Sequence, residues 1–126
     1  MAIGTARLLH TQQVHFFRKR VNYNDAGIGA GVLFGTLPAG AMIVGLNVRV
    51  NTAFNAGTTN ALNMGTTALG TQIFTDAATA GARSPAIPNI SFAVDTDLFV
   101  SYAQTGAAAT AGQADVVLSY APNIDQ

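Results

Sequence analysis

The stretch from Met42 to Thr52 constrains the fold more than any other part of the chain. In it, four apolar residues alternate with small or polar ones: Val44, Leu46, Val48 and Val50. Because successive side chains of a strand point to opposite sides, this period of two predicts a strand with one buried and one exposed face. The preceding Pro38-Ala39-Gly40 predicts a turn, since proline fixes φ and glycine permits positive φ.

Shorter segments carry the same alternation or a similar apolar signal. The later ones are 90–94, 98–102 and 115–120, and the earlier candidates are 13–17, 31–35, 61–64 and 72–74. The polar Asp95-Thr96-Asp97 predicts a hairpin turn between two of them, and breaker-rich connectors at 75–89 and 104–114 separate others. About eight strands with glycine-rich turns predict an all-β protein: a single-domain antiparallel β-sandwich, with a jelly roll as the expected wiring.

Length and charge bound the organisation and the partners. The chain has 126 residues, which suits one domain, and it has no cysteine, which excludes disulfides and thiolate metal sites. Residues 1–20 are expected to form a basic arm or first strand, and residues 21–126 the sandwich. The formal net charge is zero, which favours neither a nucleic-acid nor a membrane partner. No apolar run suits a membrane span or signal peptide, so we expect the chain to be made and used without secretion.

Catalytic and metal-binding residues are scarce, and we expect neither an enzyme nor a bound cofactor. His10 and His15 are five positions apart, a spacing that places them on one face of neither a helix nor a strand. No nucleophile-elbow motif surrounds the serines. Asp95 and Asp97 are too few for a dedicated calcium loop, and the glycines at 27–31 lack the spacing of a phosphate loop. A turn explains each of these two segments better.

The segment Phe16-Phe17-Arg18-Lys19-Arg20 is a candidate docking site. In a strand the two phenylalanines point to opposite faces, so one of them is expected to face away from the core. An exposed ring beside three basic residues suits an acidic protein surface or phosphates. The alternative is a solvated edge strand whose charges prevent sheet-to-sheet aggregation. The sequence leaves these alternatives open.

The composition of the surface points to an assembly. Only 10% of the residues are charged, whereas a freely diffusing domain usually carries more charge and a net charge away from zero. Alanine, glycine and threonine supply 50 of the 126 residues, and these small side chains permit close approach at little cost in rotamer entropy. We therefore expect neighbouring molecules to cover much of the surface. Self-association is expected around Arg49 or Phe99.

The segment 37–67 carries a resemblance to a known family. It contains a Pro-Ala-Gly turn, an alternating valine strand, the corner Thr52-Ala-Phe-Asn-Ala-Gly57 and the short strand Leu62-Asn-Met-Gly-Thr66. This order resembles the small structural proteins of tailed-bacteriophage virions, and residues 30–120 are consistent with it. The resemblance implies a jelly-roll cement or head decoration protein on the exterior of a phage head. Such proteins act as dimers or trimers that clamp neighbouring copies of the major capsid protein.

These observations together predict a non-enzymatic virion protein that cements the capsid through Phe16, Phe17, Arg18, Lys19 and Arg20. The alternative is a β-sandwich module that binds carbohydrate or a receptor in a phage tail, because jelly rolls serve both roles. Sugar-binding platforms need exposed aromatic rings, and the chain has no tryptophan and only three tyrosines. The tyrosine content therefore counts against the alternative.

Overall fold

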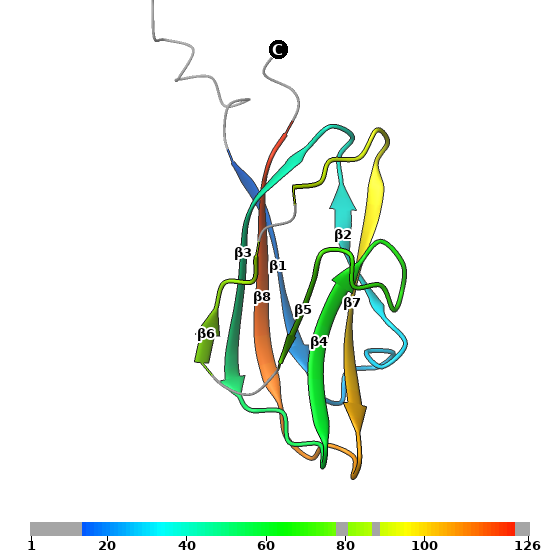
Figure 1. Ribbon diagram of the computed structural model, residues 1–126, viewed down its shortest axis with the longest axis vertical. Helices are drawn as coiled ribbons and strands as arrows, with labels where there is room; N and C mark the ends of the chain where they lie inside the picture. Colours follow the sequence, from blue (N-terminus) through cyan, green and yellow to red (C-terminus); the bar gives the residue numbers. More distant parts are fainter. Residues whose placement is uncertain (1–13, 78–80, 87–88, 123–126) are drawn as a thin grey trace, which may run out of the picture.

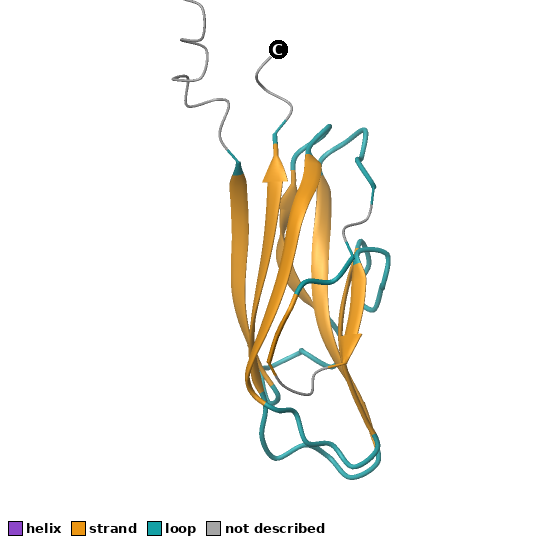
Figure 2. Cartoon of the chain, turned by 60° about the vertical axis from the view of Figure 1, so that its left-hand side comes forward, coloured by secondary structure: helices purple, strands orange, loops and turns teal. Residues whose placement is uncertain are grey.

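The computed structural model describes residues 14–77, 81–86 and 89–122, and it shows a two-layered β-sandwich (Figures 1 and 2). The strands are β1 (His15–Asn22), β2 (Val32–Leu37), β3 (Met42–Thr52), β4 (Thr59–Gly65), β5 (Phe74–Ala77), β6 (Gly81–Arg83), β7 (Thr96–Thr105) and β8 (Gln113–Ala121). The first sheet has the order β1-β8-β3-β6, and the second has the order β2-β7-β4-β5. All neighbouring strands are antiparallel. This wiring confirms the predicted jelly roll.

The core lies between the two sheets and consists of the inward-facing residues of each strand. In the first sheet β8 contributes Val116 and Leu118, which are fully buried. In the second sheet the paired strands β4 and β7 contribute Leu62, Met64 and Val100. Burial of these side chains supplies the main free energy that holds the layers together.

The long strand β3 confirms the alternation over most of its length, with one correction at its start. Leu46, Val48 and Val50 are buried as the pattern predicts. The register with β8 shifts between Ile43 and Gly45, so Ile43 is 3% exposed whereas Val44 is 41% exposed. The shift is a β-bulge, which turns the valine outward and places the preceding isoleucine in the core.

Two expectations about the middle of the chain are wrong, and their errors cancel in the count of strands. Residues 90–94 form no strand; the carbonyl of Phe92 accepts a hydrogen bond from the amide of Gly40, and its ring packs against the core from a loop. The short strand β6 instead lies within the connector predicted at 75–89. In the sequence Pro85 and Pro88 come shortly before residues 90–94 and disfavour regular pairing next to them, because proline donates no ladder hydrogen bond.

The segment Asp95-Thr96-Asp97 is not a hairpin turn, because Thr96 and Asp97 already belong to β7. Its carboxylates fix the corner between β2 and β3 instead. Asp95 accepts a hydrogen bond from the amide of Ala39 at 2.8 Å, and Asp97 accepts one from the Thr36 hydroxyl at 2.7 Å. Asp95 therefore has its partner in the turn between β2 and β3, and Asp97 has its partner near the end of β2.

The glycine-rich segment after β1 is a turn, as expected. Gly31 has a φ of +100°, and the amide of this residue donates to the carbonyl of Gly27. A Cβ atom on Gly31 would lie 1.9 Å from the carbonyl oxygen of Ala68, so both the conformation and the space require glycine. Gly29 in the same turn has open space around it.

The substitution Gly31→Ala is therefore expected to destabilise the protein by roughly 2 kcal/mol. The new methyl group would overlap the backbone of Ala68, and alanine disfavours the positive φ of this position. Gly29→Ala is the matched control and is expected to change the unfolding free energy by less than about 0.5 kcal/mol. Denaturant unfolding of both variants measures the difference. Equal stabilities would contradict this account of the turn.

Candidate interaction surface

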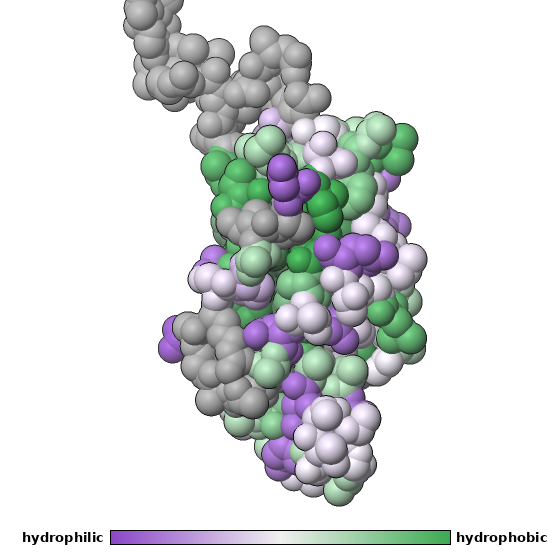
Figure 3. Space-filling view, in the orientation of Figure 1, coloured by the Kyte–Doolittle hydropathy of each residue, from purple (hydrophilic) through white to green (hydrophobic). Residues whose placement is uncertain are grey.

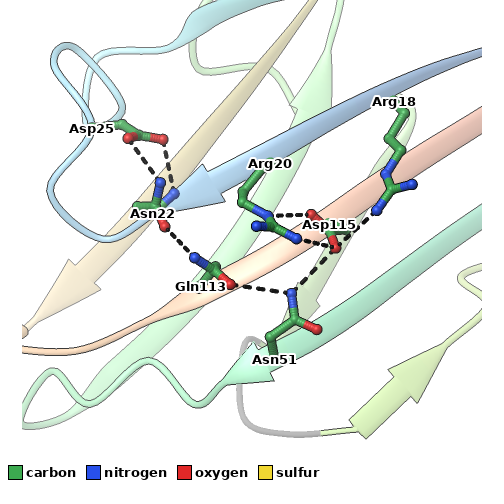
Figure 4. A network of polar contacts seen from close by, with 7 residues as sticks. All are labelled: Arg18, Arg20, Asn22, Asp25, Asn51, Gln113 and Asp115. Carbon is green, nitrogen blue, oxygen red and sulfur yellow. Dashed lines mark hydrogen bonds and ion pairs between the residues drawn. The ribbon is translucent and has the colours of Figure 1, made fainter.

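The outward face of the first sheet carries a network of charged and polar side chains centred on Asp115 of β8 (Figure 4). Its carboxylate accepts two hydrogen bonds from Arg20, at 2.9 and 3.2 Å, and one from Arg18, at 3.3 Å. The Asp115 side chain is 10% exposed, whereas those of Arg18 and Arg20 are 60% and 55% exposed. A nearly buried carboxylate thus holds two guanidinium groups that face solvent.

The network continues across three strands through amide side chains. Asn51 of β3 donates to Asp115 at 3.2 Å and to Gln113 at 3.4 Å, and Gln113 in turn donates to Asn22 at 3.0 Å. Asn22 donates to Asp25 through its backbone amide and its side chain. The network therefore links β1, β8 and β3 and the turn that follows β1 on the outer side of the sheet.

Electrostatics at Asp115 favour its charged form. The hydrogen bonds from Arg20 lower the pKa of Asp115 to about 2; burial opposes this shift, and Asn51 and the positive charges of Arg20 and Arg18 add to it. The same interaction raises the pKa of Arg20. The carboxylate is thus a permanent anchor for the arginines at neutral pH.

The strand geometry divides the predicted docking segment between two sides of β1. Phe16, Arg18 and Arg20 are exposed and lie on the outer side. Lys19 and Phe17 alternate with them and lie on the inner side, where the Phe17 ring packs on Phe34 and Tyr120, with centroid separations of 6.0 and 5.1 Å. The expectation that one phenylalanine faces away from the core is confirmed, because the Phe16 side chain is 64% exposed.

Phe16 has apolar neighbours that the sequence analysis did not identify. Val14, Met42 and Val44 are also large, exposed hydrophobic residues. The register pairs Met42 with Ala121 and Phe16 with Ser119, which places these residues at the end of the sheet where β1 begins and β8 ends. Figure 3 shows hydrophobic residues gathered at this upper end of the molecule. We call Val14, Phe16, Met42 and Val44 the apolar end.

The two residues expected to mediate self-association lie on opposite sides of the sandwich. Arg49 of β3 is exposed and pairs in register with Asp115 on the outer face of the first sheet. Phe99 of β7 is half-buried on the outer face of the second sheet, opposite Leu33 of β2, which is exposed. One flat contact cannot contain both residues.

Other candidate groups have structural partners. His15 stacks on Tyr120 with ring centroids 5.7 Å apart, and His10 lies outside the described residues. Burial raises the pKa of Tyr102, whose hydroxyl donates to Asn60. Within residues 14–77, 81–86 and 89–122 there is no cluster of three metal-ligating side chains and no pocket. The same residues include no helix long and apolar enough to cross a membrane.

Comparison with known proteins gives matches at the level of structure. No protein-family model matches the sequence, and no curated protein matches it. A chain in the acidic stable capsid structure of Helicobacter pylori bacteriophage KHP30 is 14% identical with a TM-score of 0.65; the match covers 86% of this chain and 88% of that chain. A chain in the cyanophage Pam1 capsid asymmetric unit is 21% identical with a TM-score of 0.63; the match covers 86% of this chain and 84% of that chain. These two likenesses show a shared fold over most of each chain.

The pairing of Asp115 predicts a pH dependence of stability. Its pKa is lower in the folded than in the unfolded protein, so the ion pairs stabilise the fold above about pH 4 and this stabilisation is lost as the pH falls toward 2. Because water screens the exposed guanidinium groups, we expect the ion pairs to stabilise the fold by only roughly 1 kcal/mol. Asp115→Asn should lower the unfolding free energy at pH 7 by about this amount, and the difference from wild type should shrink below pH 4.

Urea unfolding of both proteins between pH 7 and pH 2 measures this difference. Asp97→Asn is the control, because that carboxylate accepts from a threonine hydroxyl and has no arginine partner among the described residues. A difference between wild type and Asp115→Asn that persists unchanged to pH 2 would refute the ion-pair explanation.

Proposed function

We propose that this chain is a structural, non-enzymatic protein of a phage particle, which binds the exterior of the head and cements neighbouring copies of the major capsid protein. The observation that carries the proposal is the jelly roll shared with chains of two phage capsid structures, at TM-scores of 0.65 and 0.63. The match extends over more than four fifths of each chain, so it concerns the whole sandwich rather than one motif.

The surface chemistry supports the same proposal. The chain carries 12 formal charges in 126 residues. Four of its described carboxylates already accept hydrogen bonds within the fold: Asp25, Asp95, Asp97 and Asp115. A protein with so few free charges is suited to a surface that neighbours cover. Each copy would bridge two or more shell subunits, and many modest contacts on a repeating lattice give avidity.

Cementing follows from this arrangement by mass action. A protein whose complete binding surface exists only on the assembled shell stabilises that shell relative to free subunits. A homodimer or homotrimer would multiply the number of contacts made at one position. Phe99 with Leu33 on the second sheet, and Arg49 on the first, are the candidate self-contacts.

The sugar-binding alternative has less support. Tyr102 and Tyr120 are buried, and Tyr23 is half-buried against the core. A carbohydrate platform needs aromatic faces that water and sugar can reach, and none of the three tyrosines offers one that is freely exposed. We therefore retain the cement as the proposed function.

Purified particles of the virus that encodes this chain should contain it at a copy number comparable with that of the major capsid protein. Quantitative mass spectrometry of intact virions measures the ratio. Heads that lack the protein should release their DNA at a lower temperature, because the shell loses the added contacts. A few copies per particle, located with the tail, would overturn the proposal in favour of an adsorption role.

A further inference from the structure

We propose that the apolar end, together with Arg18 and Arg20, forms one docking surface that fits an apolar patch flanked by carboxylates on another protein. This inference rests on the proposed function, in which that partner is the shell protein. It assigns the attachment to one face of the sandwich, the outer face of β1, β8 and β3, and it specifies the chemistry of the partner.

The first observation is the clustering of exposed apolar side chains. Seven large hydrophobic residues of the described chain are exposed, and four of them form the apolar end. They come from β1, from the residue before it, and from the start of β3. These two segments are more than twenty residues apart in the sequence, but both pair with β8, which brings them to the same end of the sheet. Contiguous exposed hydrophobic residues of this kind mark interaction sites, whereas isolated ones need no explanation.

The second observation is that only small residues lie between these large side chains. β8 runs between β1 and β3, and its outward residues at this end are Ser119 and Ala121. Gly45 lies opposite Ser119 on β3. Small side chains at the centre with large ones at the margins allow a partner to approach the sheet closely and bury Phe16 and Met42 on binding.

The third observation is the charge beside the apolar end. The outward residues of β1, β3 and β8 include three arginines, Arg18, Arg20 and Arg49, and one carboxylate, that of Asp115. Asp115 takes two donors of Arg20 and one of Arg18, while each guanidinium has five N–H donors. The remaining donors are held in place and face solvent, so they are available to a partner's carboxylates at little cost in ordering.

This pattern favours a different protein over a second copy of the chain. The described carboxylates do not offer a matching acidic patch, because they are dispersed and engaged. Asp95 and Asp97 accept hydrogen bonds at the β2–β3 corner, Asp25 accepts from Asn22, and Asp115 already pairs with the arginines. Asp76 lies apart from them on β5 of the second sheet. The apolar end also favours a protein over nucleic acid, because phosphates would use the arginines but leave Phe16 and Met42 uncovered.

The test measures binding of the full-length protein to heads of the same virus from which it has been removed. Wild type is compared with Phe16→Ser/Met42→Ser and with the control Leu69→Ser, which removes an apolar side chain as exposed as that of Phe16 from the loop after β4. We expect at least tenfold weaker binding for the first variant and unchanged binding for the control. The thermal unfolding of each variant is measured as well, and a midpoint temperature equal to that of the wild type shows that the variant is folded.

A second arm tests the charges. Arg18→Gln leaves Asp115 paired with Arg20, and it should weaken binding at 50 mM salt and flatten the dependence of binding on salt concentration. A duplex DNA oligonucleotide is the probe for the rival partner, and tight binding to it that requires Arg18 would overturn the assignment to a protein. Wild-type binding to heads with no loss in either variant would overturn this surface alone. Failure of the wild type to bind heads would overturn the proposed function itself.

Discussion

The position of β8 is the constraint on which the rest of the structure depends. The strand closest to the end of the chain lies between β1 and β3, so its inward residues Val116 and Leu118 occupy the centre of the core. Its outward residue Asp115 pairs with Arg20, 95 positions earlier in the sequence. The first sheet therefore cannot be complete until β1 and β8 have paired, and such non-local pairing is typical of folds that assemble slowly.

The same strand gives the outer face its two parts. Small outward residues at one end of β8 leave the apolar side chains of β1 and β3 uncovered, while Asp115 near the other end holds the arginines of β1 in a fixed arrangement. The opposite face of the sandwich is different, with Leu33 and Phe99 paired across β2 and β7 and no comparable group of cations among the outward residues described there. A protein with two unlike faces is suited to a fixed orientation in a shell, with one face attached and the other free or in contact with further copies.

The sequence predicted the fold class because alternation is a local signal: Leu46, Val48 and Val50 identify a half-buried strand without knowledge of any partner. It failed where the outcome depends on pairing. Ile90, Phe92 and Val94 alternate as well as a strand does, but they pair with no strand, whereas Gly81–Arg83 pairs with β3 despite a weak local pattern. For the surface, alternation separated Phe16 from Phe17. The register that brings Met42 to the same end of the sheet as Phe16, and Asp115 beside Arg20, depends on β8 and has no signature in either segment.

The most direct test of this account is a cryo-electron microscopy reconstruction of the virion at a resolution that traces side chains. The account predicts a jelly roll on the exterior of the head whose β1–β8–β3 face lies against the shell, with Phe16 and Met42 buried there and Arg18 and Arg20 beside carboxylates of the shell protein. A jelly roll that presents this face to solvent, or a head surface without this chain, would contradict it.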